Sequence, residues 1–146
     1  MHEVHRQAIV RHNAKQMFDL VNLVSEYPNF LNWCHDSHVI ELNKDYMIAG
    51  MTVSLVGVKQ KFTTRNEFFE KENGFCIELS LVKGPFERLS GSWIFTHLTE
   101  DASKIELHLK FNFKSGLLNG AFKRAFGSIA QQLVTDFVKR AKYVYS

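Results

Sequence analysis

The sequence has few cysteines and no long apolar run, and both absences limit the class of protein. Cys34 and Cys76 are the only cysteines among 146 residues. No run of eighteen apolar residues occurs, so we expect no membrane-spanning helix. Residues 1–10 alternate and include an acidic residue, unlike a signal peptide. Two cysteines without a secretory signal favour reduced thiols in the cytoplasm.

Motifs for phosphate binding, nucleophilic catalysis and metal binding are also lacking. Neither GxxxxGK nor GxGxxG occurs. Residues 34–36 read Cys-His-Asp, but neighbours on an extended chain point to alternate faces and cannot converge as a triad. The pairs His2/His5 and His35/His38 are three positions apart and diverge for the same reason. We therefore predict no catalytic residues and no metal site.

Apolar alternation is the feature that the chain has in abundance. Hydrophobic residues make up 45% of the sequence, and thirteen residues are Phe. A length of 146 residues suits one domain, residues 1–146, which buries roughly 70% of its unfolded surface. Residues 2–10 and 35–41 have extended patterns, and a turn is expected at 43–45. Five longer strands follow, with inward rows Met47, Ala49, Met51, Val53, Leu55; Phe62, Thr64, Asn66, Phe68; Phe75, Ile77, Leu79, Leu81; Leu89, Gly91, Trp93, Phe95; and Ile105, Leu107, Leu109, Phe111, Phe113.

Helical signals occur near both ends of the chain. Asn13 and Gln16 have the spacing of a capping box, which predicts a helix to about Val24. Ser25 is the expected cap of a short helical turn that continues to Phe30. From Leu118 onward the spacing predicts one long helix with a single apolar side, formed by Phe122, Ala125, Phe126, Ile129, Ala130, Leu133 and Phe137.

Together these patterns predict an α+β fold. One apolar and one polar face indicate an antiparallel sheet that is covered on one side. We expect this sheet to curve around the long C-terminal helix, with two short helices after the first strand. Such a curved sheet tends to leave room beneath the helix. Burying each large side chain contributes roughly 1.5–3 kcal/mol, so the domain tolerates an incompletely filled interior.

Three segments are specific enough to indicate a family: residues 27–34 (YPNFLNWC), 84–95 (GPFERLSGSWIF) and 111–115 (FNFKS). With the ending 137–141 (FVKRA), they resemble the coenzyme Q-binding proteins of the START superfamily, a family that includes bacterial ribosome association toxins. This chain has Asn32 where members usually have proline. The resemblance implies the helix-grip fold and a hydrophobic tunnel that holds ubiquinone or another lipid in relatives. It also implies two alternative roles, quinone handling for respiration and binding to the large ribosomal subunit.

Aromatic side chains are the best candidates for a ligand site. Trp33, Phe86, Trp93 and Phe111 could wall a slot for a flat quinone ring, with Asn66 or Thr64 donating to a carbonyl. The alternative for any single one of these residues is packed core. The complete set of predicted ligand-binding residues is Trp33, Val53, Leu55, Asn66, Phe68, Leu79, Leu81, Phe86, Trp93, Phe111, Phe122, Phe126, Ile129 and Leu133.

Catalysis is not expected, because the inward rows contain no acid–base pair. Thr64 and Asn66 are the polar residues on these rows, whereas the charged strand residues have the opposite parity. The predicted function is therefore non-catalytic binding and delivery of ubiquinone or a similar lipid in support of respiratory electron transport. No cofactor is required, and ubiquinone or lipid is expected only as the ligand.

Positive charge is concentrated near the C-terminus and suggests an external partner. Residues 114–146 contain six basic residues and one acidic residue. The predicted contact residues Lys83, Arg124, Lys139 and Lys142 could meet anionic lipid or the phosphates of ribosomal RNA. The alternative is an ordinary solvated helix face. No RNP1 or KH-type GxxG motif occurs, and no DNA partner is expected. The predicted location is cytoplasmic, with peripheral contact at the inner membrane as an option.

Overall fold

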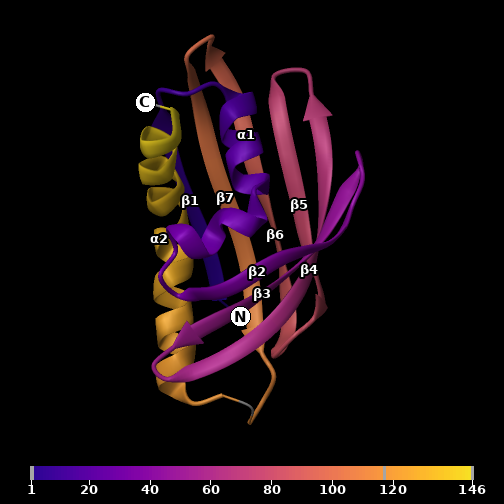
Figure 1. Cartoon of the computed structure of the whole chain (residues 1–146), viewed down its shortest axis with the longest axis vertical. Helices are drawn as coiled ribbons and strands as arrows, with labels where there is room; N and C mark the ends of the chain where they lie inside the picture. Colours follow the sequence, from indigo (N-terminus) through magenta and orange to yellow (C-terminus); the bar gives the residue numbers. More distant parts are fainter. Residues whose placement is uncertain (1, 117, 146) are drawn as a thin grey trace.

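A single antiparallel sheet forms the framework of the computed structural model, which describes residues 2–116 and 118–145 (Figure 1). Its seven strands have the order β1-β7-β6-β5-β4-β3-β2, so β1 and β2 are the edges. The elements are β1 (His2–Val10), α1 (Ala14–Asn22), the 3₁₀ helix η1 (Val24–Asn29), β2 (Cys34–Leu42), β3 (Tyr46–Leu55), β4 (Val58–Lys71), β5 (Gly74–Lys83), β6 (Phe86–Thr99), β7 (Ala102–Phe113) and α2 (Gly120–Tyr145). This arrangement confirms the predicted α+β helix-grip fold.

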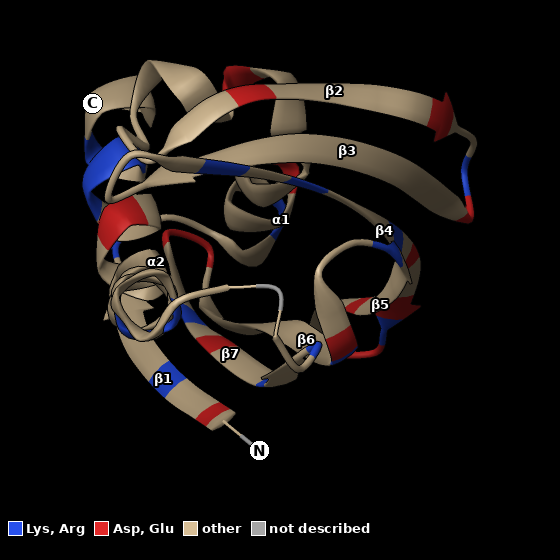
Figure 2. Ribbon diagram, turned by 90° about the horizontal axis from the view of Figure 1, so that it is seen from below, with Lys and Arg blue, Asp and Glu red and all other residues tan. Residues whose placement is uncertain are grey.

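The sheet is strongly curved, and the helices lie on its inner side. Seen along the long axis, β2 and β3 lie on one side and β7 and β1 on the other, with α1 and α2 between them (Figure 2). Register shifts interrupt the β2–β3 pairing at residues 34–36 and 39–41, and the β4–β5 pairing at 63–64. Such irregularities bend a strand and increase its twist, which helps β2, β3 and β4 to turn across the other strands of the sheet (Figure 1).

The first helix forms as the sequence predicts. The Asn13 side chain accepts a hydrogen bond from the Gln16 backbone N–H at 2.9 Å, and the Gln16 side chain accepts one from the Asn13 N–H at 3.0 Å. α1 ends at Asn22, two residues before the predicted end. The prediction that Ser25 caps the second helical turn is wrong: η1 already begins at Val24, and its N-cap residue Leu23 makes no side-chain hydrogen bond.

The alternation predicted for the strands is present in the structure, most clearly in β7. Every second residue from Ile105 to Phe113 is buried, with exposed fractions between 0% and 8%. Gly91 on β6 allows a close approach to β7, because an added Cβ would lie 2.2 Å from the carbonyl oxygen of His108. The inward rows of the sheet thus form a continuous apolar surface facing the helices.

α2 packs on this surface in two different ways. Near its N-terminus, Phe122 and Phe126 interlock with three aromatic rings of the sheet, at centroid separations of 5.1–6.3 Å. We call this cluster the aromatic plug; it consists of Phe86, Phe111, Phe113, Phe122 and Phe126. Further along, Val134 is buried, although the predicted stripe contained Leu133 in its place. Ile129 and Leu133 are only half-buried, because they border a cavity. Among the described residues, neither helix combines the length and hydropathy that a membrane-spanning helix needs.

Candidate ligand-binding cavity

A cavity of about 120 Å³ lies between the inner face of the sheet and the helices. An apolar cavity of about 150 Å³ is large enough to hold benzene, whereas sites for drug-sized ligands measure roughly 300–1,000 Å³. In this conformation the space is therefore the size of one ring. Its lining is mostly apolar and comes from the α1–η1 segment, from the sheet and from the middle of α2.

The cavity brings together half of the predicted ligand-binding residues. Those that line it are Trp33, Asn66, Leu79, Trp93, Phe126, Ile129 and Leu133. They come from five elements or connections: the η1–β2 connection, β4, β5, β6 and α2. Trp93 also packs edge-on against Phe137 of α2, with ring centroids 5.4 Å apart. The half-buried members of the set keep accessible surface beneath the helix, which is the surface that a ligand would cover.

The other seven predicted ligand-binding residues do not line the cavity, so the predicted set is wider than the cavity. These residues are Val53, Leu55, Phe68, Leu81, Phe86, Phe111 and Phe122. Phe86, Phe111 and Phe122 are at most 2% exposed and belong to the aromatic plug, where the other rings occupy the space around them. Phe68 instead stands edge-on to Phe18 of α1, at 5.9 Å. Of the four aromatic residues proposed for a quinone slot, only Trp33 and Trp93 line the cavity.

One wall of the cavity was missed by sequence reasoning. Val21 and Asn22 at the end of α1, and Val24 and Tyr27 in η1, close the space on the side away from the sheet. The apolar face of α1 was visible in the sequence, because Met17, Leu20 and Val21 follow a helical spacing. That spacing does not indicate which end of the helix packs against the core and which end borders the cavity.

Polar groups in the cavity are few and neutral. Thr64 Oγ1 donates a hydrogen bond to Asn66 Oδ1 at 3.0 Å, which leaves the amide N–H groups of Asn66 as donors for a ligand carbonyl. The Tyr27 hydroxyl donates to the backbone carbonyl oxygen of Val21. Burial raises the pKa of Tyr27 above its ordinary value, so this hydroxyl stays protonated. The cavity can therefore orient a carbonyl-bearing ring by hydrogen bonding.

Acid–base chemistry has no support in the lining. None of the described lining residues is Asp, Glu, His, Lys, Arg or Cys. Cys34 is buried in β2, where its thiol donates to the carbonyl oxygen of Asp36 at 3.4 Å. Burial raises the pKa of this thiol to about 11, which disfavours the thiolate needed for nucleophilic attack. His35 and Asp36 beside it are both exposed, because the register shift at residues 34–36 interrupts the strict alternation of the strand.

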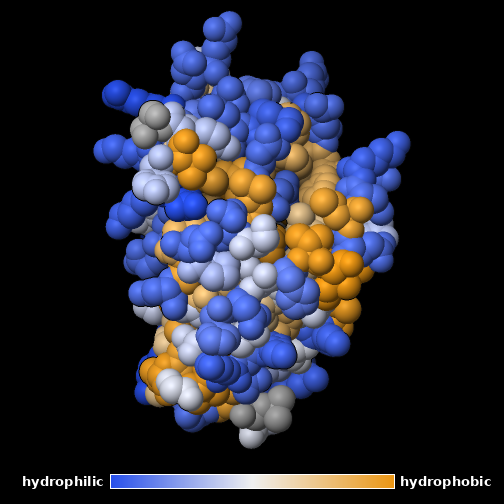
Figure 3. Space-filling view, viewed as in Figure 1, coloured by the Kyte–Doolittle hydropathy of each residue, from blue (hydrophilic) through white to orange (hydrophobic). Residues whose placement is uncertain are grey.

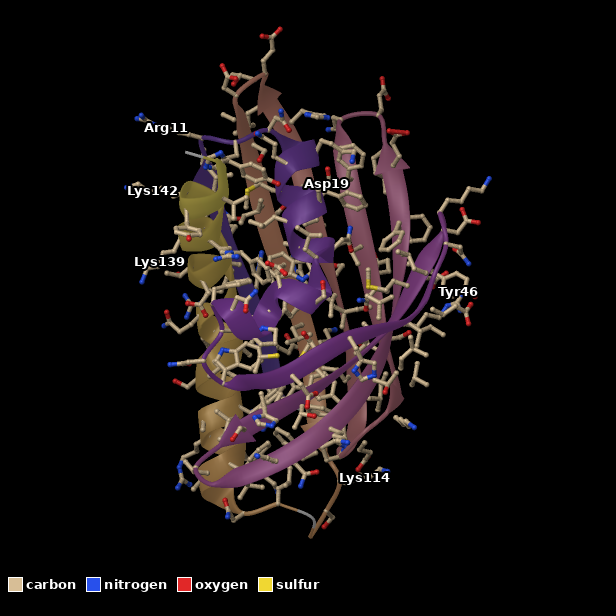
Figure 4. The ribbon with its side chains drawn as sticks, viewed as in Figure 1. Arg11, Asp19, Tyr46, Lys114, Lys139 and Lys142 are labelled. Carbon is tan, nitrogen blue, oxygen red and sulfur yellow. The ribbon has the colours of Figure 1, made fainter. Side chains whose placement is uncertain are left out.

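The four basic residues predicted to contact a partner do not form one surface patch. Lys139 and Lys142 of α2 project from the same side of the molecule as Arg11 in the β1–α1 connection (Figure 4). We call these three residues the basic side. Arg124 lies fifteen residues before Lys139 on the same helix, about 22 Å away along its axis. Lys83 ends β5, and the adjoining Phe86 is buried, so this loop offers no exposed aromatic ring.

Apolar side chains are exposed at the opposite edge of the sheet. Val39, Ile40 and Leu42 of the edge strand β2 are 38%, 55% and 61% exposed. Figure 3 shows apolar surface interrupted by hydrophilic groups on this face of the molecule. The basic side and the exposed apolar residues of β2 therefore do not form one combined lipid-binding surface.

A curved antiparallel sheet that encloses a ring-sized apolar cavity with one long helix defines a helix-grip ligand-binding domain. Residues 10–138 match the sequence profile of the family described as "Polyketide cyclase / dehydrase and lipid transport", and the chain belongs to this family. The match includes every element that lines the cavity.

Several relatives are similar over nearly the whole chain. The ribosome association toxin RatA of Vibrio cholerae is 43% identical over 145 residues, covering 99% of each chain. RatA of Escherichia coli K12 is 42% identical, covering 100% of this chain and 90% of the relative. A mitochondrial coenzyme Q-binding protein COQ10 homolog B of Xenopus laevis is 24% identical, covering 98% of this chain and 59% of the relative.

Solved structures share the fold at low sequence identity. A START superfamily protein from Mycobacterium smegmatis superposes with a TM-score of 0.77 at 15% identity, covering 99% of both chains. An aromatase/cyclase from Streptomyces gives a TM-score of 0.79 at 15% identity, covering 99% of this chain and 96% of that one. The same fold thus occurs in an enzyme, and function must be argued from the site.

Proposed function

We propose that this protein binds a hydrophobic ligand with a carbonyl-bearing ring, ubiquinone or a similar lipid, and delivers it in support of respiratory electron transport without performing chemistry. The observation that supports this most is the cavity itself, which combines an apolar lining with the Thr64–Asn66 pair. Flat stacking surfaces and one amide donor suit a quinone ring. The described lining contains no Asp, Glu, His, Lys, Arg or Cys, and its Tyr27 stays protonated, which suits binding without chemistry.

Size determines how such a ligand would be held. A cavity of about 120 Å³ accepts the ring but not a polyprenyl tail. Each CH₂ of the tail that leaves water stabilises the complex by about 0.8 kcal/mol. The tail would therefore stabilise a conformation that is open along α2. Ile129 and Leu133 are half-buried there and could rotate away from the sheet. We infer that the ring enters the cavity and that the tail displaces these two side chains.

Organic extraction of the purified protein, followed by mass spectrometry, tests this proposal. Protein from a ubiquinone-producing host should contain quinone or another isoprenoid lipid, whereas Ile129→Trp should lose most of it because the indole fills the cavity. Gln132→Trp is the matched control, since it places the same side chain at an exposed position of α2. Recovery of no lipid from the wild type, or equal retention by Ile129→Trp, would overturn the proposal.

Ribosome association is the second candidate, and the comparisons favour it. Relatives named as ribosome association toxins reach 42–43% identity over the whole chain, against 24% for the coenzyme Q-binding homolog. The basic side supplies a surface of the required charge, with Lys139 and Lys142 both exposed. Cationic side chains of this kind contact RNA phosphates through salt-sensitive attraction. In this reading the partner is the large ribosomal subunit.

Co-sedimentation with purified ribosomal subunits tests the second candidate. The wild type should sediment with the large subunit, and Lys139→Glu/Lys142→Glu should sediment much less. Lys44→Glu/Lys71→Glu is the charge-matched control, because these lysines are exposed near the β2–β3 turn and on β4. Binding that vanishes at moderate salt, or that both double variants lose equally, would indicate charge attraction alone.

The two candidates are separable in one protein. Ile129→Trp changes the interior, and the lysine variants change only the surface. If ribosome binding survives Ile129→Trp while lipid retention is lost, the two activities are independent. If both are lost in a folded variant, the ligand controls the ribosome-binding surface.

A further inference from the structure

Three potential metal ligands meet on the outer face of the sheet, on the side away from the cavity. His5 is the register partner of His108 across the β1–β7 pairing, and Glu106 precedes His108 by two positions on the same face. One ligand atom from each of the three residues lies within 4.8 Å of the others. His5 and His108 are separated by about one hundred residues in the chain, and only the pairing of β1 with β7 brings them together.

The two imidazoles are already aligned with each other. Their ring centroids lie 4.0 Å apart at an interplanar angle of 28°. Zinc ligands at about 2.1 Å in tetrahedral geometry lie about 3.4 Å from one another. Stacked rings direct their in-plane nitrogen lone pairs side by side, so the imidazoles must turn about their side-chain torsions to converge on one ion. The paired backbones hold them close before it binds.

Neighbouring charges oppose a cation only weakly. Lys104 Nζ lies 3.7 Å from Glu106 Oε1, in a pair whose lysine side chain is 37% exposed. Lys110 Nζ lies 3.9 Å from Glu3 Oε1, and both of these side chains are more than half exposed. Such pairs contribute little. A divalent ion can therefore displace Lys104 from Glu106, while Lys110 retains its own acidic partner.

We propose that His5, Glu106 and His108 bind a transition-metal dication of the zinc type. Two imidazole nitrogens and one carboxylate suit Zn²⁺ and the neighbouring first-row metals better than Ca²⁺ or Mg²⁺, which prefer oxygen ligands. Three protein ligands leave the remaining coordination position to solvent. His5 is exposed, and the other two residues are half-buried, so an ion can reach the site directly. The bound ion would link the edge strand β1 to β7.

Isothermal titration calorimetry with Zn²⁺ alone tests the site. The wild type should bind one equivalent, and His5→Ala and His108→Asn should each weaken binding by at least about tenfold, since each removes one of the three ligands. Glu106→Gln should weaken it less. His35→Ala is the matched control, because this exposed histidine lies on the other edge strand. Unchanged affinity in His5→Ala, or an equal loss in His35→Ala, would overturn the proposal.

Thermal unfolding provides a second measurement for the same variants. Zn²⁺ should raise the Tm of the wild type by stabilising the folded state, and EDTA should reverse the increase. The folded His5→Ala and His108→Asn variants should show no increase. An equal rise in these variants would place the ion elsewhere. This site is independent of the cavity, so its failure would not affect the proposed function.

Discussion

The N-terminal part and the middle of the α2 interface contrast sharply, although both are built from large apolar side chains. In the aromatic plug, rings from β6, β7 and α2 interlock and leave Phe86, Phe111 and Phe122 at most 2% exposed. Around the cavity, Trp33, Ile129 and Leu133 are only half-buried. The difference lies in the sheet curvature and in the helix layer above, because α1 and η1 hold the middle of the structure apart. Apolar composition alone therefore does not decide which region is solid.

The largest effect is expected in the plug. Phe111→Ala should lower the free energy of unfolding by about 3–5 kcal/mol, since neighbouring rings cannot collapse into the space. Leu133→Ala beside the cavity should lower it by less than about 2 kcal/mol, because this side chain is already half-exposed. Chemical denaturation of both variants measures the contrast. Equal losses would show that the two regions are packed alike.

Thiol reactivity gives a second comparison, between an edge strand and a central one. Burial raises the pKa of both Cys34 and Cys76 from 9.0 to about 11. Both thiols are therefore protonated at neutral pH, and alkylation should be roughly 100-fold slower than for an ordinary thiol. The rate should rise about tenfold per pH unit up to about pH 11, instead of levelling near pH 9.

Cys34 should react faster than Cys76. β2 is an edge strand with two register shifts, whereas β5 is central, and edges open more readily. Peptide mapping after timed alkylation separates the two sites, and denatured protein gives the rate for exposed thiols. Faster labelling of Cys76 would contradict the assignment of β2 as the less stable strand.

A smaller loss of unfolding free energy is expected when the hydrogen bond between η1 and α1 in the cavity wall is removed. Tyr27→Phe removes the donor to the Val21 carbonyl, which links η1 to α1. We expect a loss of about 1–2 kcal/mol in unfolding free energy, because a buried acceptor loses its partner. Tyr46→Phe is the control, since its hydroxyl bonds to Glu41 at an exposed position. A loss no larger than the control's would show that this wall does not depend on the bond.

The smallest effect on stability should come from the polar pair inside the cavity. Thr64→Val removes the hydroxyl that donates to Asn66 but keeps the side-chain shape. The unfolding free energy should change by less than about 1 kcal/mol, since Asn66 can bond to water in the open space. If the proposed ligand binds, its affinity should nevertheless fall. A large loss of stability without ligand would make the pair a structural element of the core.

Some parts of this architecture follow directly from residue order. The capping box at Asn13 and Gln16, the alternation of β7 and the turn at Asn43 all depend on neighbours within a few positions. Local geometry fixes such features, so the predicted strands and helices match the observed ones closely. Ser25 failed as a cap because the chain had already entered η1 one residue earlier.

The candidate site was predictable only in part. Asn66, Trp93 and Ile129 line the cavity, and they lie on inward rows or on the helix stripe that the sequence shows. Phe111 satisfies the same pattern but lies in the plug, since alternation gives the face of a residue and not its depth along the sheet. Phe86 has the opposite parity to the inward row of its strand, and the register shift between Phe86 and Arg88 turns it into the plug. The wall from Val21 to Tyr27 was missed because it depends on where a short helix docks.

The order of residues is enough to predict which side chains face inward, which segments are helical, and that a curved sheet covers one long helix. These properties depend on the period of apolar residues, which is a property of the chain. The position of the cavity, the lysines beside Arg11 and the meeting of His5 with His108 became apparent only in the folded molecule. Those outcomes depend on strand register, bulges and helix docking, which join residues that are far apart in the sequence.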